Sequence, residues 1–219
     1  TLLIIKNSDL IKIIADNFPN SIVFISILFL LISGAAVINF INFMDGIDGI
    51  VTGNMIFIFF AGSILVSNYY LLYAGPLIGF LIWNWHPSKV FMGDVGSTFL
   101  GSLFLALLLN TENISDTFTL LMVASPLLLD ALFCIPRRMM NGQKVFEAHC
   151  SHLYQRLVQA GWSHGSVAIL YMLFTILLLI TMIIGNRLNM ISILLVQLSI
   201  GFWLDQKIAI PFENSLKDK

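Results

Sequence analysis

Four polar side chains spaced by three residues lie in a short segment between two apolar stretches. They are Asn39, Asn42, Asp45 and Asp48, with Gly46 and Gly49 after the two aspartates. Spacing of three places side chains one above another on a continuous helix, whereas the glycines favour a tight turn that approaches a ligand closely. Either geometry directs several oxygens toward one point. The alternative is a helix junction in which Asp48 is the N-cap of the next helix.

A second acidic segment, Phe91–Ser97, holds Asp94 between two glycines and follows an aromatic stretch with a proline. We expect a helix to end at the aromatic residues and a new one to start near Ser97, so that free backbone N–H groups form an anion site. Asp94 and Asp45 are the predicted metal ligands. Mg²⁺ is preferred and Mn²⁺ is the alternative, because Mg²⁺ is commonly held by one or two carboxylates plus substrate phosphates. The alternative for Asp94 is an N-cap. The substrate-binding candidates of this region are Asn84, Lys89, Gly93, Gly96 and Ser97, together with Asn39 and Asn42.

A long polar segment, 136–164, is the third candidate region, and we expect it to be a substrate-binding loop and helix. On a helix His149, His152 and Arg156 follow one another at i, i+3 and i+7, which favours recognition of an anion, with Arg137 and Arg138 as further binding candidates. Zinc would need another ligand at compatible spacing, and none is evident. The alternative is an amphipathic helix lying on lipid headgroups.

Asp130 lies inside an apolar stretch, where an unpaired carboxylate is costly. Arg137 follows seven residues later and would lie close to the same face of a continuous helix. A purely structural role for Asp130 would therefore be an ion pair with Arg137.

Composition places these motifs in a membrane protein. Of the 219 residues 58% are hydrophobic and 11% are charged, with a mean hydropathy of +0.92, whereas soluble domains carry about 25% charged residues. A net charge of −1 without a long basic run argues against nucleic acid as a partner. Cys134 and Cys150 have neither metal nor redox spacing, so we expect free thiols.

The elements that must position the motifs are apolar runs of spanning length. We expect an all-α polytopic transmembrane helix bundle of about seven spans, near 21–39, 51–67, 69–84, 97–109, 117–135, 165–184 and 189–204. Seven spans place residues 40–50, 85–96, 136–164 and 205–219 on one side, with eight of the eleven basic residues. The positive-inside rule makes this side, which carries all three motif regions, cytoplasmic.

Taken together, Asn42–Gly49, Phe91–Ser97 and His149–Leu157 resemble the motifs of the polyprenyl-phosphate N-acetylhexosamine-1-phosphate transferases. The resemblance implies a bacterial inner-membrane enzyme that transfers a sugar-1-phosphate from a UDP-amino sugar to polyprenyl phosphate and releases UMP. It implies a magnesium-binding Asp94, a nucleotide-diphosphate site shaped by Asn42, Asp45 and Asp48, and substrate contacts from His149 and His152. The expected catalytic residues are therefore Asp45, Asp48, Asp94, His149 and His152. The third motif is closer to the branch that starts surface polysaccharides such as O-antigen than to the muramoyl branch.

Two features depart from the family pattern. No adjacent aspartates occur in the chain, although the family carries such a pair in an upstream loop, and Cys150 stands where related proteins have arginine. We therefore expect residues 1–219 to be one membrane domain, the C-terminal part of a longer transferase, and doubt that it is active alone. The alternatives are an inactive remnant and a transporter component with Asp130 on an ion path. A homodimer is an option.

Overall fold

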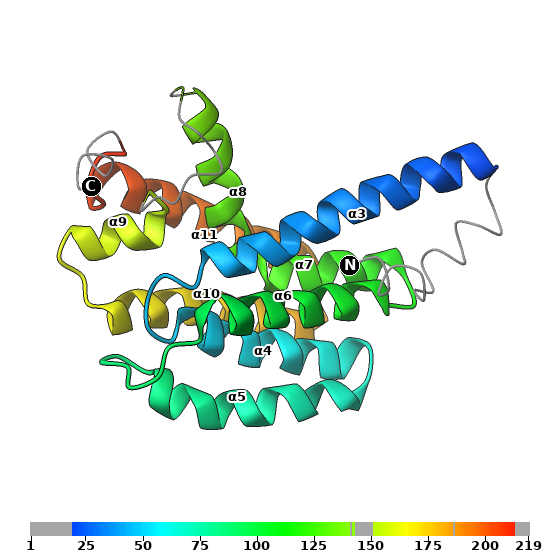
Figure 1. Cartoon of the computed structure of the whole chain (residues 1–219), viewed down its shortest axis with the longest axis horizontal. Coiled ribbons are helices and arrows are strands. Elements are labelled where there is room, and N and C mark those ends of the chain that lie inside the picture. The colour runs from blue at the N-terminus through cyan, green and yellow to red at the C-terminus, as the bar shows by residue number, and fades with distance from the viewer. Residues whose placement is uncertain (1–18, 141, 143–150, 186, 213–219) are drawn as a thin grey trace.

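The computed structural model describes residues 19–140, 142, 151–185 and 187–212, and within these ranges the regular structure is entirely helical (Figure 1). The elements in chain order are α3 (Asn20–Phe43), α4 (Ile50–Leu65), the 3₁₀ helix η1 (Asn68–Tyr70), α5 (Leu71–Asn84), α6 (Gly93–Leu109), α7 (Ile114–Val123), α8 (Ser125–Met140), α9 (Leu153–Gln159), α10 (His164–Ile183) and α11 (Arg187–Lys207). The predicted all-α class is confirmed.

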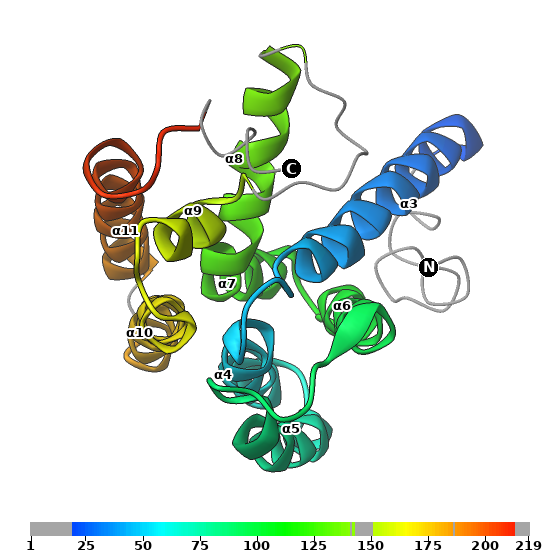
Figure 2. The ribbon, with the colours of Figure 1, turned by 60° about the vertical axis from the view of Figure 1, so that its left-hand side comes forward.

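Helix α4 packs mainly against α5 and α10, and it also contacts α6 and α7. Figure 2 shows α4, α5, α6 and α10 nearly end-on, so their axes run in similar directions. Helix α3 lies across α6 and also packs against α8. Buried apolar side chains from several helices, among them Phe59, Phe104 and Leu178, form one continuous core.

Hydropathy identifies this bundle as a multi-pass membrane protein. Helices α3, α10 and α11 are each long and apolar enough to cross a bilayer, and α7 with α8 provides a fourth crossing if the two form one span. Helices α4 and α6 are apolar but shorter. Each of the seven predicted segments contains a helix, and the expected break near Ser67 separates α4 from η1. The count of seven membrane spans stays a prediction.

The span expected over 117–135 is not one continuous helix. Helices α7 and α8 meet at an 80° bend, and Ala124 separates them. Pro126 lies in the first turn of α8, where a missing N–H is tolerated but a continuing helix would lose a hydrogen bond. The predicted start of the helix near Ser97 also differs from the structure. Helix α6 begins at Gly93, which has a φ of 68°, so Asp94 lies in the first turn of α6.

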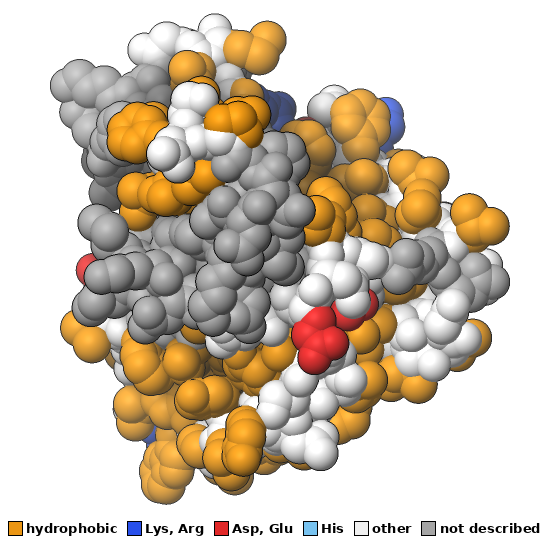
Figure 3. Space-filling view, turned by 90° about the vertical axis from the view of Figure 1, so that its right-hand side faces the viewer, with side chains coloured by type: hydrophobic (Ala, Val, Ile, Leu, Met, Phe, Trp, Pro, Cys, Tyr) orange, Lys and Arg blue, Asp and Glu red, His pale blue; other side chains and the backbone are white. Residues whose placement is uncertain are grey.

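The described motif loops gather at one end of the molecule, on the left in Figure 1. A Cβ on Gly49 would lie 3.1 Å from the Trp85 ring, so the loops after α3 and α5 are in contact. Tyr154 of α9 donates a hydrogen bond to the carbonyl of Phe43, at 2.9 Å. At the opposite end, the described side chains that Figure 3 shows are mostly hydrophobic, and they include a small acidic patch.

Candidate active site

The first group of motif residues, which we call the acidic cluster, consists of Asn42, Asp45, Gly93, Asp94 and Ser97. The amide nitrogen of Asn42, in the last turn of α3, donates to Asp94 Oδ1 at 3.3 Å and to Ser97 Oγ at 2.8 Å. Ser97 is fully buried, whereas Asp94 is exposed at the start of α6. The cluster thus joins the ends of two helices and leaves a carboxylate open to a ligand.

The close crossing of α3 and α6 makes this junction possible. A Cβ on Gly101 of α6 would lie 2.9 Å from the Ile38 Cα and 3.0 Å from its carbonyl oxygen. Small residues permit such backbone contact between membrane helices. Gly101 therefore helps set the separation at which Asn42 reaches Asp94.

Asp45 has an unusual ionisation in this cluster. Burial, followed by the negative charge of Asp94, raises the pKa of Asp45 to about 7, although a hydrogen bond from the Gly93 backbone acts in the opposite direction. Two carboxylates that disfavour each other's ionisation form a fitting environment for a divalent cation, because the cation would stabilise both charges. The residues present therefore fit the magnesium ion that the sequence predicts.

Asp48 belongs to a second group, which we call the histidine triad: Asp48, His86 and His164. Asp48 Oδ2 lies 2.8 Å from His86 Nδ1 and 3.2 Å from His164 Nδ1. Ser88 Oγ donates to Asp48 Oδ1 at 2.7 Å. Burial would raise the pKa of Asp48, but His86, Ser88 and His164 outweigh it and lower the pKa below its ordinary value.

The N-cap interpretation of Asp48 is wrong, because Gly49 occupies the N-cap position of α4 with a φ of 75°. Gly49 turns the chain into α4 in the left-handed conformation, which glycine adopts without steric cost. Asp94 is not an N-cap either, since it lies inside the first turn of α6 and Met92 precedes the helix. Both carboxylates are thus engaged in contacts between elements rather than in capping.

Asn84 holds the two loops together from a buried position. Its side-chain oxygen accepts from Thr52 Oγ1 at 2.7 Å and from the Gly49 backbone at 3.2 Å, and its amide donates to the Val90 carbonyl at 3.0 Å. These contacts position the loops around the triad. Exposed Lys89 lies with its ammonium 5.4 Å from the centre of the Trp83 ring.

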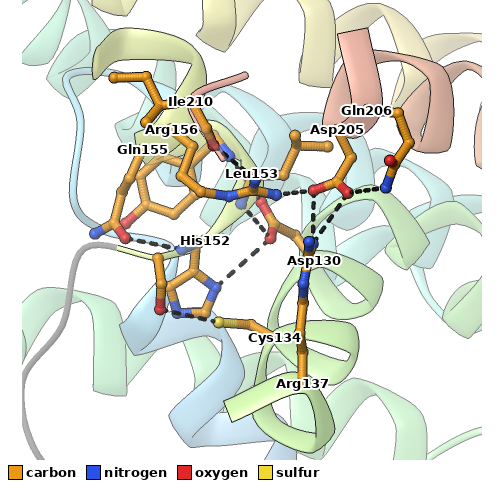
Figure 4. A network of polar contacts seen from close by, with 12 residues as sticks. Asp130, Cys134, Arg137, His152, Leu153, Gln155, Arg156, Asp205, Gln206 and Ile210 are labelled. Carbon is orange, nitrogen blue, oxygen red and sulfur yellow. Dashed lines mark hydrogen bonds and ion pairs between the residues drawn. The ribbon is translucent and has the colours of Figure 1, made fainter. Parts of the chain in front are cut away.

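Asp130 is the centre of a third network, shown in Figure 4, which joins α8 to α9. Its carboxylate accepts from the backbone N–H groups of Leu153 at 2.8 Å and Tyr154 at 3.1 Å, and from the Tyr171 hydroxyl at 2.6 Å. His152 Nδ1 lies 3.6 Å from the same carboxylate. Asp130 thus holds the first turn of α9, so its charge has partners from two other elements.

The predicted ion pair between Asp130 and Arg137 is wrong. Arg137 Nη1 donates to both carboxylate oxygens of Asp205, at 2.9 and 3.0 Å, and Arg156 forms an ion pair with the same carboxylate. Arg156 Nη1 also donates to the Ile210 carbonyl at 2.9 Å (Figure 4). The bend before α8 and the return of α11 bring these groups together, which spacing along one helix does not reveal.

His152 is buried, with 2% of its side chain exposed. Burial favours the neutral imidazole, but contacts with Asp130 and Cys134 outweigh it and raise the pKa of His152 to about 9. The imidazole is therefore positively charged at neutral pH, and its charge compensates that of the Asp130 carboxylate.

The expected helix carrying His149, His152 and Arg156 on one face begins only at Leu153, with His152 as its N-cap. His152 and Arg156 are both buried and contact different carboxylates, whereas His149 and Cys150 lie outside the described residues. Three further predicted binding residues lie as follows. Asn39 donates a hydrogen bond to the Ala35 carbonyl one turn earlier in α3, and Arg138 is buried, with 4% of its surface exposed. Gly96 packs closely, since a Cβ on it would contact the Met92 side chain. Cys134 is a free thiol, as predicted.

A cavity of about 680 Å³ lies between α8, α9, α10 and α11. Its lining is mostly apolar, with side chains such as Phe133, Phe174 and Phe202, and the polar residues Asp130, Arg137, Arg156 and Asp205 border it.

Sequence reasoning did not single out His86, Ser88, His164 or Asp205 as site residues. His86 follows the aromatic stretch before a proline, and His164 follows Ser163, which caps α10 by accepting a hydrogen bond from the Ser166 backbone. The available signal was that His86 and His164 lie next to the ends of predicted spans, on the face that the span count predicts to be cytoplasmic. The contact between Asp48 and His164, 116 positions apart, has no local sequence signature.

Comparison with known proteins assigns the chain to a family. Over 150 residues it is 32% identical to a probable undecaprenyl-phosphate N-acetylglucosaminyl 1-phosphate transferase of Bacillus subtilis, covering 62% of this chain and 41% of the relative. It is 33% identical over 183 residues to decaprenyl-phosphate N-acetylglucosaminephosphotransferase of Mycobacterium leprae, covering 68% and 45%. It is 31% identical over 183 residues to phospho-N-acetylmuramoyl-pentapeptide-transferase of Clostridium beijerinckii, covering 78% and 54%.

The chain therefore spans about half the length of the curated relatives that it matches. The sequence profile described as "Glycosyl transferase family 4" matches residues 2–112, which include the acidic cluster and two members of the histidine triad. The chain belongs to glycosyl transferase family 4.

Proposed function

We propose that the chain carries the catalytic face of a magnesium-dependent transferase, which moves an amino-sugar-1-phosphate from a UDP-sugar to polyprenyl phosphate. The observation that carries the proposal is the acidic cluster: Asp94 is exposed, Asp45 lies beside it, and Asn42 orients it at the end of a membrane bundle. The printed names of the relatives, which describe transfer to undecaprenyl or decaprenyl phosphate, support the choice of acceptor.

In this proposal an oxygen of the lipid phosphate attacks the sugar-bearing phosphorus of the donor. The new P–O bond forms as the bond to the bridging oxygen breaks, so UMP leaves with that oxygen. Asp45 and Asp94 would hold Mg²⁺, which supplies charge neutralisation to the diphosphate. Asn42 and Ser97 fix the Asp94 carboxylate, and exposed Lys89 can meet a donor phosphate from solvent.

His152 acts as a positioning residue in this scheme, because it is buried against Asp130 and fixes the start of α9. His149, Arg137, Arg138 and Arg156 remain candidates for substrate contact, with the charges of Arg137 and Arg156 shared with Asp205. The face bearing these groups is proposed to be cytoplasmic, in a bacterial inner membrane. The transporter alternative has less support, since Asp130 is engaged by α9 and α10.

The test adds labelled UDP-N-acetylglucosamine, undecaprenyl phosphate and Mg²⁺ to membranes that contain the protein. We expect UMP and a lipid-linked sugar, and Mg²⁺-dependent retention of the UDP-sugar by the purified protein. Asp94→Asn should reduce both, while Asn110→Ala at the opposite end should reduce neither. Turnover that is equal in Asp94→Asn and the wild type, or donor binding that ignores Mg²⁺, would show that the metal assignment is wrong.

A further inference from the structure

The histidine triad has the donor set of a transition-metal site. One ligand atom each from Asp48, His86 and His164 lies within 4.8 Å of the other two. The side chains of His86 and His164 are 38% and 34% exposed, and that of Asp48 is 10% exposed. An ion could therefore reach the group from solvent, while the carboxylate itself is largely enclosed.

The spacing of these atoms agrees with metal coordination. Metal–ligand bonds of about 2.1 Å place neighbouring ligands about 3.0 Å apart in octahedral sites and about 3.4 Å apart in tetrahedral sites. The two imidazole Nδ1 atoms lie 2.8 and 3.2 Å from the same oxygen of Asp48. Small side-chain rotations would bring all three donors to one ion.

His164 supplies an independent observation. Its Nδ1 atom is buried and, among the described residues, makes no hydrogen bond, although Asp48 Oδ2 is 3.2 Å away. If this nitrogen is unprotonated, its lone pair faces the Asp48 carboxylate, and a cation bound by both atoms would remove the repulsion between them.

We infer that Asp48, His86 and His164 form a second cation site, which takes a zinc-class transition metal. Two imidazoles and a carboxylate favour Zn²⁺, Co²⁺ or Ni²⁺ over Mg²⁺, which prefers oxygen ligands. The site is distinct in chemistry from the acidic cluster, where oxygen donors predominate. Its ligands come from the loop after α3, the loop after α5 and the start of α10, so an ion would tie these three segments together.

The test titrates Co²⁺ into the 219-residue protein, purified in detergent with a histidine-free tag, and follows the visible d–d absorption. We expect one Co²⁺ per chain at this site, displaced by Zn²⁺ and not by Mg²⁺. His86→Ala and His164→Ala should each weaken Co²⁺ binding by more than the roughly 10- to 100-fold typical of outer-shell changes. His152→Gln, a change at a buried histidine in another network, and Asp94→Asn should leave it intact.

Thermal unfolding shows whether each variant is folded. If an alanine variant does not fold, His86→Gln or His164→Gln is used in its place. The inference is overturned if Co²⁺ does not bind stoichiometrically, or if both histidine variants bind it as the wild type does. Because the readout needs neither a UDP-sugar nor turnover, failure of the proposed transferase activity leaves this test unaffected.

Discussion

Asn42 on α3 donates its side-chain amide to Asp94 on α6 at 3.3 Å, across 52 positions of sequence. The same amide lies 2.8 Å from Ser97 Oγ, so one side chain fixes both the first turn of α6 and its carboxylate. The orientation of the proposed magnesium ligand therefore depends on a neutral residue of a different helix.

Replacing Asn42 with alanine should weaken metal binding while leaving the fold intact. Outer-shell partners of metal ligands are typically worth about 10- to 100-fold in affinity, so we expect a loss in that range for Mn²⁺ measured by electron paramagnetic resonance. Asn110→Ala is the matched control, because its amide contacts the Tyr70 hydroxyl at the other end of the bundle. An unchanged Mn²⁺ affinity in Asn42→Ala would show that Asp94 is positioned without it.

Gly101→Ala should act on the same site from a distance. The added Cβ would lie 2.9 Å from the Ile38 Cα, and backbone cannot rotate out of the way as a side chain can. We expect a destabilisation of about 1–3 kcal/mol, the usual range for overpacking, together with weaker Mn²⁺ binding as α3 and α6 separate. Gly201→Ala serves as control, since a Cβ there meets no described atom within 4 Å. Equal thermal midpoints for the two variants would contradict this account.

The charge on His152 predicts a pH dependence of stability. Burial opposes the charge, but Asp130 and Cys134 raise the pKa from 6.5 to about 9, so the folded protein keeps a proton that the unfolded chain releases above pH 6.5. The stabilisation is fully present below pH 6.5 and is lost as the pH rises through 9; the shift corresponds to about 3 kcal/mol.

Thermal unfolding of the purified protein between pH 6 and about 9.5 checks this dependence. The described groups that face His152 are Asp130 and Cys134 from α8, the Phe43 ring and Tyr154 from α9. The His152→Gln variant should lose most of the decline in midpoint with rising pH. A decline as steep as that of the wild type would assign the dependence to another group.

Asp205→Asn should destabilise the protein strongly. Asp205 compensates Arg156, whose side chain is 2% exposed, and it also binds Arg137. Removing one member of a buried pair typically costs about 3–5 kcal/mol, because the remaining charge is left without a partner. Denaturant or thermal unfolding would measure the loss, with exposed Glu112→Gln as control. A change below about 1 kcal/mol, as found for surface pairs, would mean that solvent already screens Asp205.

Hydropathy was sufficient to place a helix in each predicted segment, and glycine chemistry correctly indicated the tight turn at Gly49. The break between α7 and α8 was missed because Ala124 and Pro126 lie in a mostly apolar stretch of spanning length, where hydropathy alone does not indicate a bend. Pairing of Asp130 with Arg137 failed for a related reason: spacing reports neighbours on one helix, whereas Asp205 and Tyr171 arrive from elsewhere in the fold.

The candidate site likewise has a part that was predicted from the sequence and a part that was not. Asp45 and Asp94 were predicted as a pair because their glycine-flanked loops were expected on one face, and the structure brings the two carboxylates close enough for Asp94 to affect the pKa of Asp45. The histidines beside Asp48 were not predicted. Hydrogen-bond direction and burial at His164 are properties of the packed loops, and sequence spacing carries no information about them.

The contact between Asp48 and His164 also has a consequence for biosynthesis. A ribosome that makes this chain from its N-terminus completes Asp48 and His86 well before it reaches His164, at the start of α10. Before α10 is made, the partners of Asp48 that the described part of the structure shows are His86 and Ser88 of the loop after α5. The synthesis of α10 therefore determines when the three segments around Asp48 can become fixed against one another.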